Sequence, residues 1–201
     1  MPDTFVQGLL AGLLQPLAGI AYVAAFVAVG LIAAAQPLGW LTVLAFTGGV
    51  LFGAFLQAAE RALQGADALI ASAVVVLGAL LVRTLPVRPA IAGTLLALAG
   101  VLHGYGLASF ASGAQDGALY GYLLGVVLVQ LLISYGLLLL APSLKARTWF
   151  QPVWIRLIGA AIVGIGLTLL ADQLTPGSSR SEEEEDVQIS EDSRSDRNAL
   201  V

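Results

Sequence analysis

The sequence predicts an all-α fold: a polytopic transmembrane bundle of about six helices, preceded by a short N-terminal half-helix. Of the 201 residues, 58% are hydrophobic and only 11% are charged, whereas soluble domains carry about 25% charged residues. Most of the charges lie in one C-terminal run, so the rest of the chain is poorer still. Long apolar runs separated by Pro- and Gly-containing turns supply the expected membrane spans.

The region around Gln15 is the point that the rest of the chain is expected to enclose. The preceding apolar stretch, residues 5–14, has about ten residues and reaches only ~15 Å, so it predicts a half-helix. A break is expected at Gln15–Pro16, and the first full helix then continues to about Ala35. Polar groups beside irregular backbone at membrane depth require protein or water around them.

Five further helices follow from the remaining apolar runs. They are expected at about residues 40–59, 65–81, 90–109, 118–140 and 152–174. Residues 1–175 therefore form a transmembrane helical domain. Residues 176–201 are rich in Ser, Glu, Asp and Arg and too poor in large apolar residues to form a core, so they predict a disordered acidic tail.

The distribution of basic residues predicts the orientation. Setting the tail aside, five basic residues flank the loops after the first, third and fifth helices, and only Arg61 lies on the other side. Those five are Arg83, Arg88, Lys145, Arg147 and Arg156. Because Lys and Arg concentrate in cytoplasmic loops, both termini are predicted to be extracytoplasmic, with the protein in a bacterial inner or thylakoid-like membrane.

Four polar residues from three helices fall in the outer half of the membrane under this topology. They are Gln15, Tyr22, His103 and Gln130, and Asp67 at the outer end of its helix is a further member of the set. An ionisable residue inside a membrane is a functional hypothesis by default. Hydrogen bonding between helices explains the same residues without a ligand, and the sequence leaves both interpretations open.

Glycines at four-residue spacing predict close helix packing within the chain rather than a dimer face. They form three series: Gly49/Gly53, Gly100/Gly104 and Gly117/Gly121/Gly125.

Three segments resemble the HupE/UreJ family, membrane proteins encoded with hydrogenase and urease accessory genes and regarded as nickel, in some members cobalt, permeases. Residues 8–22, GLLAGLLQPLAGIAY, and 28–30 are similar to its first motif, in which a His-Pro pair precedes Gly and then Asp-His. Residues 65–78 are similar to its third helix. Residues 102–106, LHGYG, fall at its histidine-rich motif.

The departures from that pattern concern the metal ligands. Gln15 stands where the family has His, and Ala21 and Tyr22 stand where it has Asp-His. Only His103 remains of the later histidines, with Tyr105 and Leu107 at the other positions, and Gln130 replaces a further His. The resemblance thus implies the family fold and a weak, oxygen-dominated metal path of His103, Gln15, Tyr22, Asp67 and Gln130.

The favoured function is a permease for a divalent transition metal of the nickel or cobalt type, carried as cargo with no permanently bound cofactor. The alternative is a non-transporting membrane subunit or assembly factor that kept the fold and lost the ligands. No acid–base constellation, nucleotide loop or nucleic-acid surface is evident, so we do not expect an enzyme. The expected partners are the lipid bilayer and, in the alternative, a membrane protein complex.

Overall fold

The computed structural model describes residues 2–59, 63–83, 88–145 and 152–174. The predicted acidic tail and the basic residues Arg61 and Arg147 lie outside these ranges. The described chain is entirely helical, which confirms the predicted class. The helices are α1 (Phe5–Ala18), α2 (Ile20–Ala34), α3 (Gly39–Ala58), α4 (Ala66–Val82), α5 (Pro89–Ser109), α6 (Asp116–Lys145) and α7 (Pro152–Leu174).

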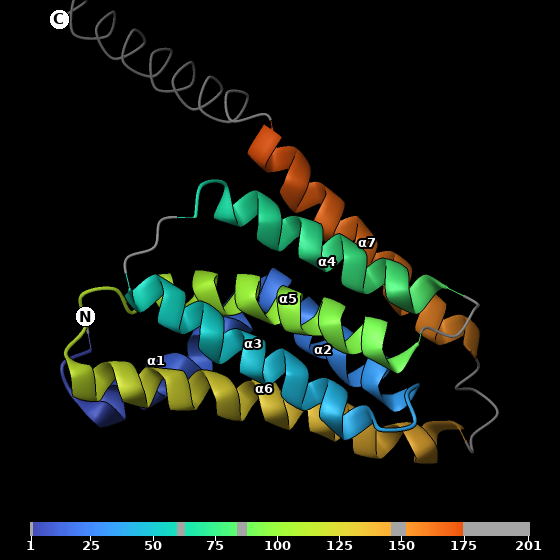
Figure 1. Ribbon diagram of the computed structural model, residues 1–201, viewed down its shortest axis with the longest axis horizontal. Coiled ribbons are helices and arrows are strands. Elements are labelled where there is room, and N and C mark those ends of the chain that lie inside the picture. Colours follow the sequence, from blue (N-terminus) through green and yellow to red (C-terminus); the bar gives the residue numbers. More distant parts are fainter. Residues whose placement is uncertain (1, 60–62, 84–87, 146–151, 175–201) are drawn as a thin grey trace, which may run out of the picture.

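Four of these helices, α3, α5, α6 and α7, are long and apolar enough to cross a membrane. The pair α1–α2 makes a fifth span if both helices are counted as one, although they meet at an angle of 85°. Helix α4 is apolar but has only 17 residues, or about 26 Å of helix. The chain is therefore a membrane protein of short and long helices packed side by side (Figure 1).

The backbone breaks at Gly19 and not at the predicted Gln15–Pro16. Helix α1 continues through Pro16 to Ala18, and the corner is Gly19, whose extended backbone has φ −98° and ψ 111°. Transmembrane helices tolerate an internal proline because neighbouring groups satisfy the freed carbonyl. The Tyr22 ring packs against the bare backbone of this corner, since a Cβ on Gly19 would lie 2.5 Å from Cδ2 of Tyr22.

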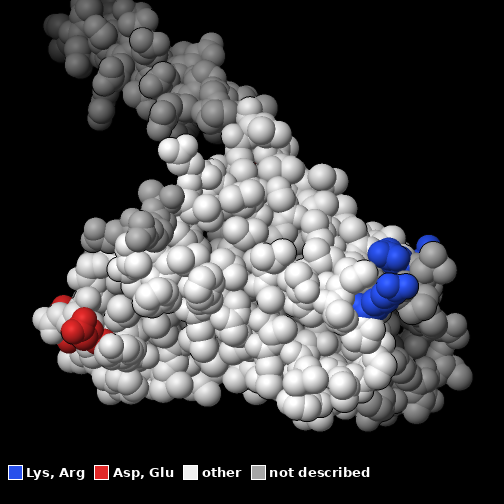
Figure 2. Space-filling model, viewed as in Figure 1, with Lys and Arg blue, Asp and Glu red and all other residues white. Residues whose placement is uncertain are grey.

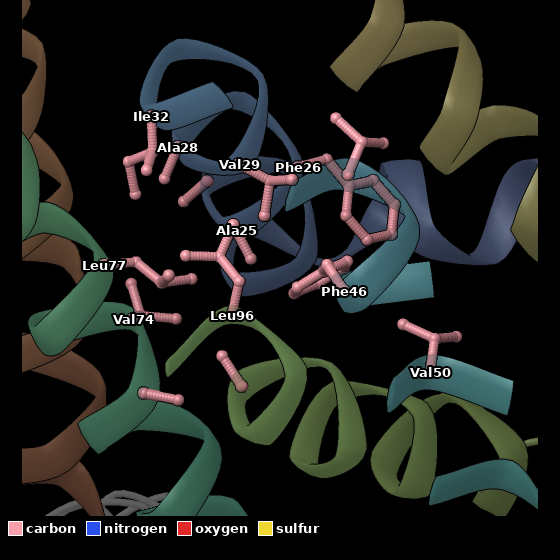
Figure 3. Close-up of a cluster of buried hydrophobic side chains, with 14 of the residues drawn as sticks. Ala25, Phe26, Ala28, Val29, Ile32, Phe46, Val50, Val74, Leu77 and Leu96 are labelled. Carbon is pink, nitrogen blue, oxygen red and sulfur yellow. The ribbon is translucent and has the colours of Figure 1, made fainter. Parts of the chain in front are cut away.

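Helix α2 is the hub of the bundle. It contacts each of the other six described helices, and residues 24–26 and 28–33 are all buried. Figure 3 shows Phe26 and Val29 facing Phe46 of α3, while Leu77 of α4 and Leu96 of α5 close the cluster from the other helices. The chain therefore encloses α2, and the expectation that it encloses the region around Gln15 is wrong, because Leu14 and Leu17 beside Gln15 are exposed.

The other helices associate mainly as pairs, α3 with α5, α1 with α6 and α4 with α7. In the α3–α5 pair, a Cβ on Gly53 would overlap the carbonyl of Val101, and one on Gly104 would overlap that of Val50. The α1–α6 pair shows the same reciprocal contact through Gly12 and Gly121. Lipid supplies no hydrophobic force between helices, so such close packing is what holds them together. The predicted intramolecular role of the glycine series is confirmed, except at Gly117, where the space is open.

The two ends of the bundle carry opposite charge. Figure 2 shows acidic side chains at one end and basic side chains at the other. The helix bounds assign Asp3, Asp67 and Asp116 to the first end, and Arg83 and Arg88 to the second. The acidic end is the one that the sequence places outside, so we call it the outer end.

Candidate functional site

His103 lies on α5 in the centre of the bundle, with no exposed surface. Its Nδ1 is 2.8 Å from the carbonyl oxygen of Ala99, one turn earlier on the same helix. A carbonyl oxygen can only accept, so Nδ1 carries the proton and donates it. In the neutral ring, Nε2 then presents a lone pair, and this atom is buried without a hydrogen-bond partner among the described residues.

Two aromatic rings cover His103. Tyr22 of α2 packs edge-on, with ring centroids 5.9 Å apart, and Phe46 of α3 packs at a tilt at the same distance. The backbone carbonyl of Ala21 also lies beside the imidazole, but it makes no hydrogen bond with Nε2. The histidine is therefore enclosed by α2, α3 and α5, and its Nε2 is buried without a hydrogen-bond partner among the described residues.

Tyr22 connects His103 to the outer end of the bundle. Its hydroxyl fits against Gly106 of α5, where a Cβ would lie 2.8 Å from the hydroxyl oxygen. Asp67 is exposed in the first turn of α4 and lies within electrostatic range of Tyr22. Nearby, the hydroxyl of Tyr122 on α6 donates to the carbonyl of Leu107 at 2.7 Å. Tyr22 therefore contacts His103 directly and lies within electrostatic range of Asp67 at the surface.

Gln130 lies on α6 and forms a second buried polar group. The Thr47 hydroxyl is positioned to donate to Gln130 Oε1 and to the carbonyl of Val43, each 2.9 Å away. One turn further, the hydroxyl of Ser134 donates to the carbonyl of Phe26 at 3.0 Å. The amide nitrogen of Gln130 has no partner among the described residues. Gln130 is thus held against α3 and is separate from the Tyr22–His103 contact.

The five predicted path residues are therefore brought together only in part. Tyr22 and His103 are in contact, and Asp67 approaches Tyr22 from the surface. Gln15 is half-buried in the last turn of α1 and makes no side-chain hydrogen bond within the described part of the chain. The sequence reasoning missed Thr47, Ser134 and Tyr122, although a hydroxyl inside an apolar helix was a usable signal.

Metal-ligating residues are sparse at this site. Within the described ranges, no group of three or more His, Asp or Glu residues lies close enough together to hold a metal ion. His103 is accompanied instead by a tyrosine, backbone carbonyls and a more distant glutamine. The groups in contact with His103 thus offer one imidazole nitrogen and oxygens, without a carboxylate beside them.

A separate groove opens at the outer end between α3, α5 and α6. Its volume is about 670 Å³, and its walls are mainly apolar, with Gln57, Tyr105, Ser112 and Tyr120 as polar members. His103 does not line this groove.

Comparison with known proteins decides the family. The family model described as HupE / UreJ protein matches residues 2–169, which is most of the chain. The chain belongs to the HupE/UreJ family. No curated protein and no solved structure gives a match. HupE/UreJ membership implies, in general terms, an accessory or transport role connected with nickel or cobalt.

Proposed function

We propose that this HupE/UreJ protein is a permease that moves a divalent transition metal, nickel or cobalt, across the membrane past His103. The observation that carries the proposal is the buried, unpartnered Nε2 of His103. A buried polar atom without a partner is rare and needs an explanation, such as an ion that occupies the position transiently.

The local chemistry supports a ligand role for this histidine. Histidines that bind metals usually donate their other ring N–H to a carboxylate, a backbone carbonyl or water, which fixes the tautomer and the ring direction. His103 makes such a bond to Ala99. The carbonyl oxygen of Ala21 also lies beside the ring. This oxygen and the lone pair of Nε2 repel each other, and a cation between them would attract both.

In such a permease, this structure corresponds to the closed state of the path. The rings of Tyr22 and Phe46 cover His103, so one of them must move before an ion can pass. Tyr22 is the better candidate for the outer gate, because it lies next to the Gly19 corner and faces Gly106, which has no side chain. Asp67 at the surface would attract cations towards this gate.

The orientation follows from the charged ends. With Arg83 and Arg88 on the cytoplasmic side of a bacterial inner membrane, the acidic end and both termini face outwards. Cations then enter at the acidic end and meet Tyr22 before His103.

The test is cellular metal content, measured by mass spectrometry over nickel, cobalt, copper, zinc and manganese. Cells would express the wild-type chain, His103→Ala, or Thr168→Val as a control at equal membrane abundance. Thr168 is exposed on α7 and bonds only within its helix, so its loss should not matter. We expect the content of one metal to change with wild type and Thr168→Val but not with His103→Ala. Equal metal content in cells with and without the wild-type chain would refute the permease.

The alternative function is a non-transporting subunit or assembly factor. The groove of about 670 Å³ favours it, because an apolar, open surface between three helices is suited to receive a partner helix. Co-purification of a stoichiometric membrane partner, lost when the exposed groove residue Ala58 is replaced by Trp, would support this function. Retention of the partner by Ala58→Trp would place the contact elsewhere.

A further inference from the structure

The hydroxyl of Thr47 lies within hydrogen-bond distance of two acceptors, but it has only one proton to donate. The Thr47 hydroxyl lies 2.9 Å from both Val43 O and Gln130 Oε1. A hydroxyl has one proton and can make only one full donation, although its oxygen can also accept. If the Thr47 proton goes to Gln130 Oε1, it is not donated to Val43 O, so Thr47, Val43 and Gln130 make only one hydrogen bond among them. Both N–H groups of the buried Gln130 amide then remain unpaired.

Turning the amide by 180° gives a better arrangement. The Thr47 proton then goes to Val43, the usual choice for a threonine inside a helix, and the Gln130 NH₂ donates to the Thr47 oxygen. The same atoms now make two hydrogen bonds, and each contributes favourably to stability. The atom left facing the bundle without a partner becomes the carbonyl oxygen of Gln130.

This orientation gives the bundle a second buried electron-pair donor. The first is Nε2 of His103, also unpartnered and without exposed surface. Helix α3 separates the two, since Phe46 packs on His103 while the adjacent Thr47 holds Gln130. An imidazole nitrogen and an amide oxygen are both ligands that a divalent transition metal accepts.

The two donors lie at similar depths on different faces of α3. Phe46 packs on His103, and Thr47 holds Gln130. These two residues are adjacent on α3, so they differ in depth by only about 1.5 Å. Since α5 and α6 run in opposite directions, the side chains of His103 and Gln130 lean in opposite directions along the bundle (Figure 1).

Resting on the proposed permease function, we propose that Gln130, oriented by Thr47, presents its carbonyl oxygen to the bundle interior and is a second binding station for the cation, on the other side of α3 from His103. Thr47 is then a positioning residue that acts through Gln130.

The amide orientation has a test that requires no metal. The full-length protein, with ¹⁵N-labelled glutamine side chains, would be observed by NMR in lipid nanodiscs, and the Gln130 signal would be assigned by its loss in Gln130→Leu. In Thr47→Val the Gln130 NH₂ loses its acceptor, so its proton resonances should shift, whereas Thr47→Ser should preserve them. Unchanged Gln130 resonances in folded Thr47→Val would overturn the proposed orientation.

The binding role is tested with Co²⁺ alone, titrated into the same nanodiscs. We expect Gln130→Leu to weaken Co²⁺ binding at least about tenfold, as losses around metal ligands do, and Gln130→Glu to tighten it. Wild-type affinity in Gln130→Leu, combined with lost binding in His103→Ala, would overturn the second station and leave the permease standing. No Co²⁺ binding by wild type would count against both, while the NMR result would still decide the orientation.

Discussion

The close packing of α3 on α5 gives a quantitative prediction for Gly104→Ala. The added methyl would lie 2.6 Å from Cα of Val50 and would overlap its carbonyl oxygen. Because non-bonded carbon atoms prefer about 3.5–4.0 Å, the two helices must separate locally by about 1 Å. Overpacking of this kind typically costs about 1–3 kcal/mol.

Gly93→Ala provides the matched control on the same helix. A Cβ at Gly93 meets no atom within 4 Å, so the methyl enters open space. Alanine then has the better helix propensity, which favours this variant by up to about 1 kcal/mol. The same gain in helix propensity applies at Gly104 and cancels in the comparison, so the two alanine variants should differ in unfolding free energy by the overpacking cost, about 1–3 kcal/mol.

The assay is reversible unfolding of the purified protein in mixed micelles of increasing SDS content, followed by circular dichroism. Gly104→Ala should unfold at a lower SDS fraction than wild type, and Gly93→Ala at the same or a higher fraction. If the two variants unfold together, the glycine contacts do not hold α3 against α5, and close backbone packing does not stabilise this pair of helices.

Two further predictions concern the outer end and the first helix. Because the C-terminus is expected outside, alkaline phosphatase fused after Val201 should be active, and green fluorescent protein fused there should not fluoresce. The reverse result would show that the topology is inverted. Gly12→Ala should loosen the packing of α1 on α6, because the methyl would overlap the carbonyl of Tyr122, and protease should then cleave near Gly19 faster. Gly117→Ala, where the space is open, should be cleaved as slowly as wild type, and equal cleavage of both variants would contradict the packing.

The sequence by itself determined the class of the protein and the nature of its packing. Apolar runs as long as a bilayer is thick allow few structures other than helices, because every backbone group must be bonded internally. The glycine series could be assigned to helix contacts for the same reason, since only closely approaching backbones require them. The positions of the charged residues and the family resemblance also follow from the amino-acid sequence, without knowledge of any contact between helices.

Only the tertiary structure decided where the backbone breaks and which polar groups meet. Pro16 looked like the break, but a helix inside a bundle tolerates proline, and the corner lies at Gly19, where the Tyr22 ring packs against the backbone. Depth along each helix placed His103 and Gln130 in one half of the membrane, yet the rotation of each helix sent one side chain towards Tyr22 and the other towards Thr47. That rotation depends on packing against several neighbours at once, which no single helix encodes.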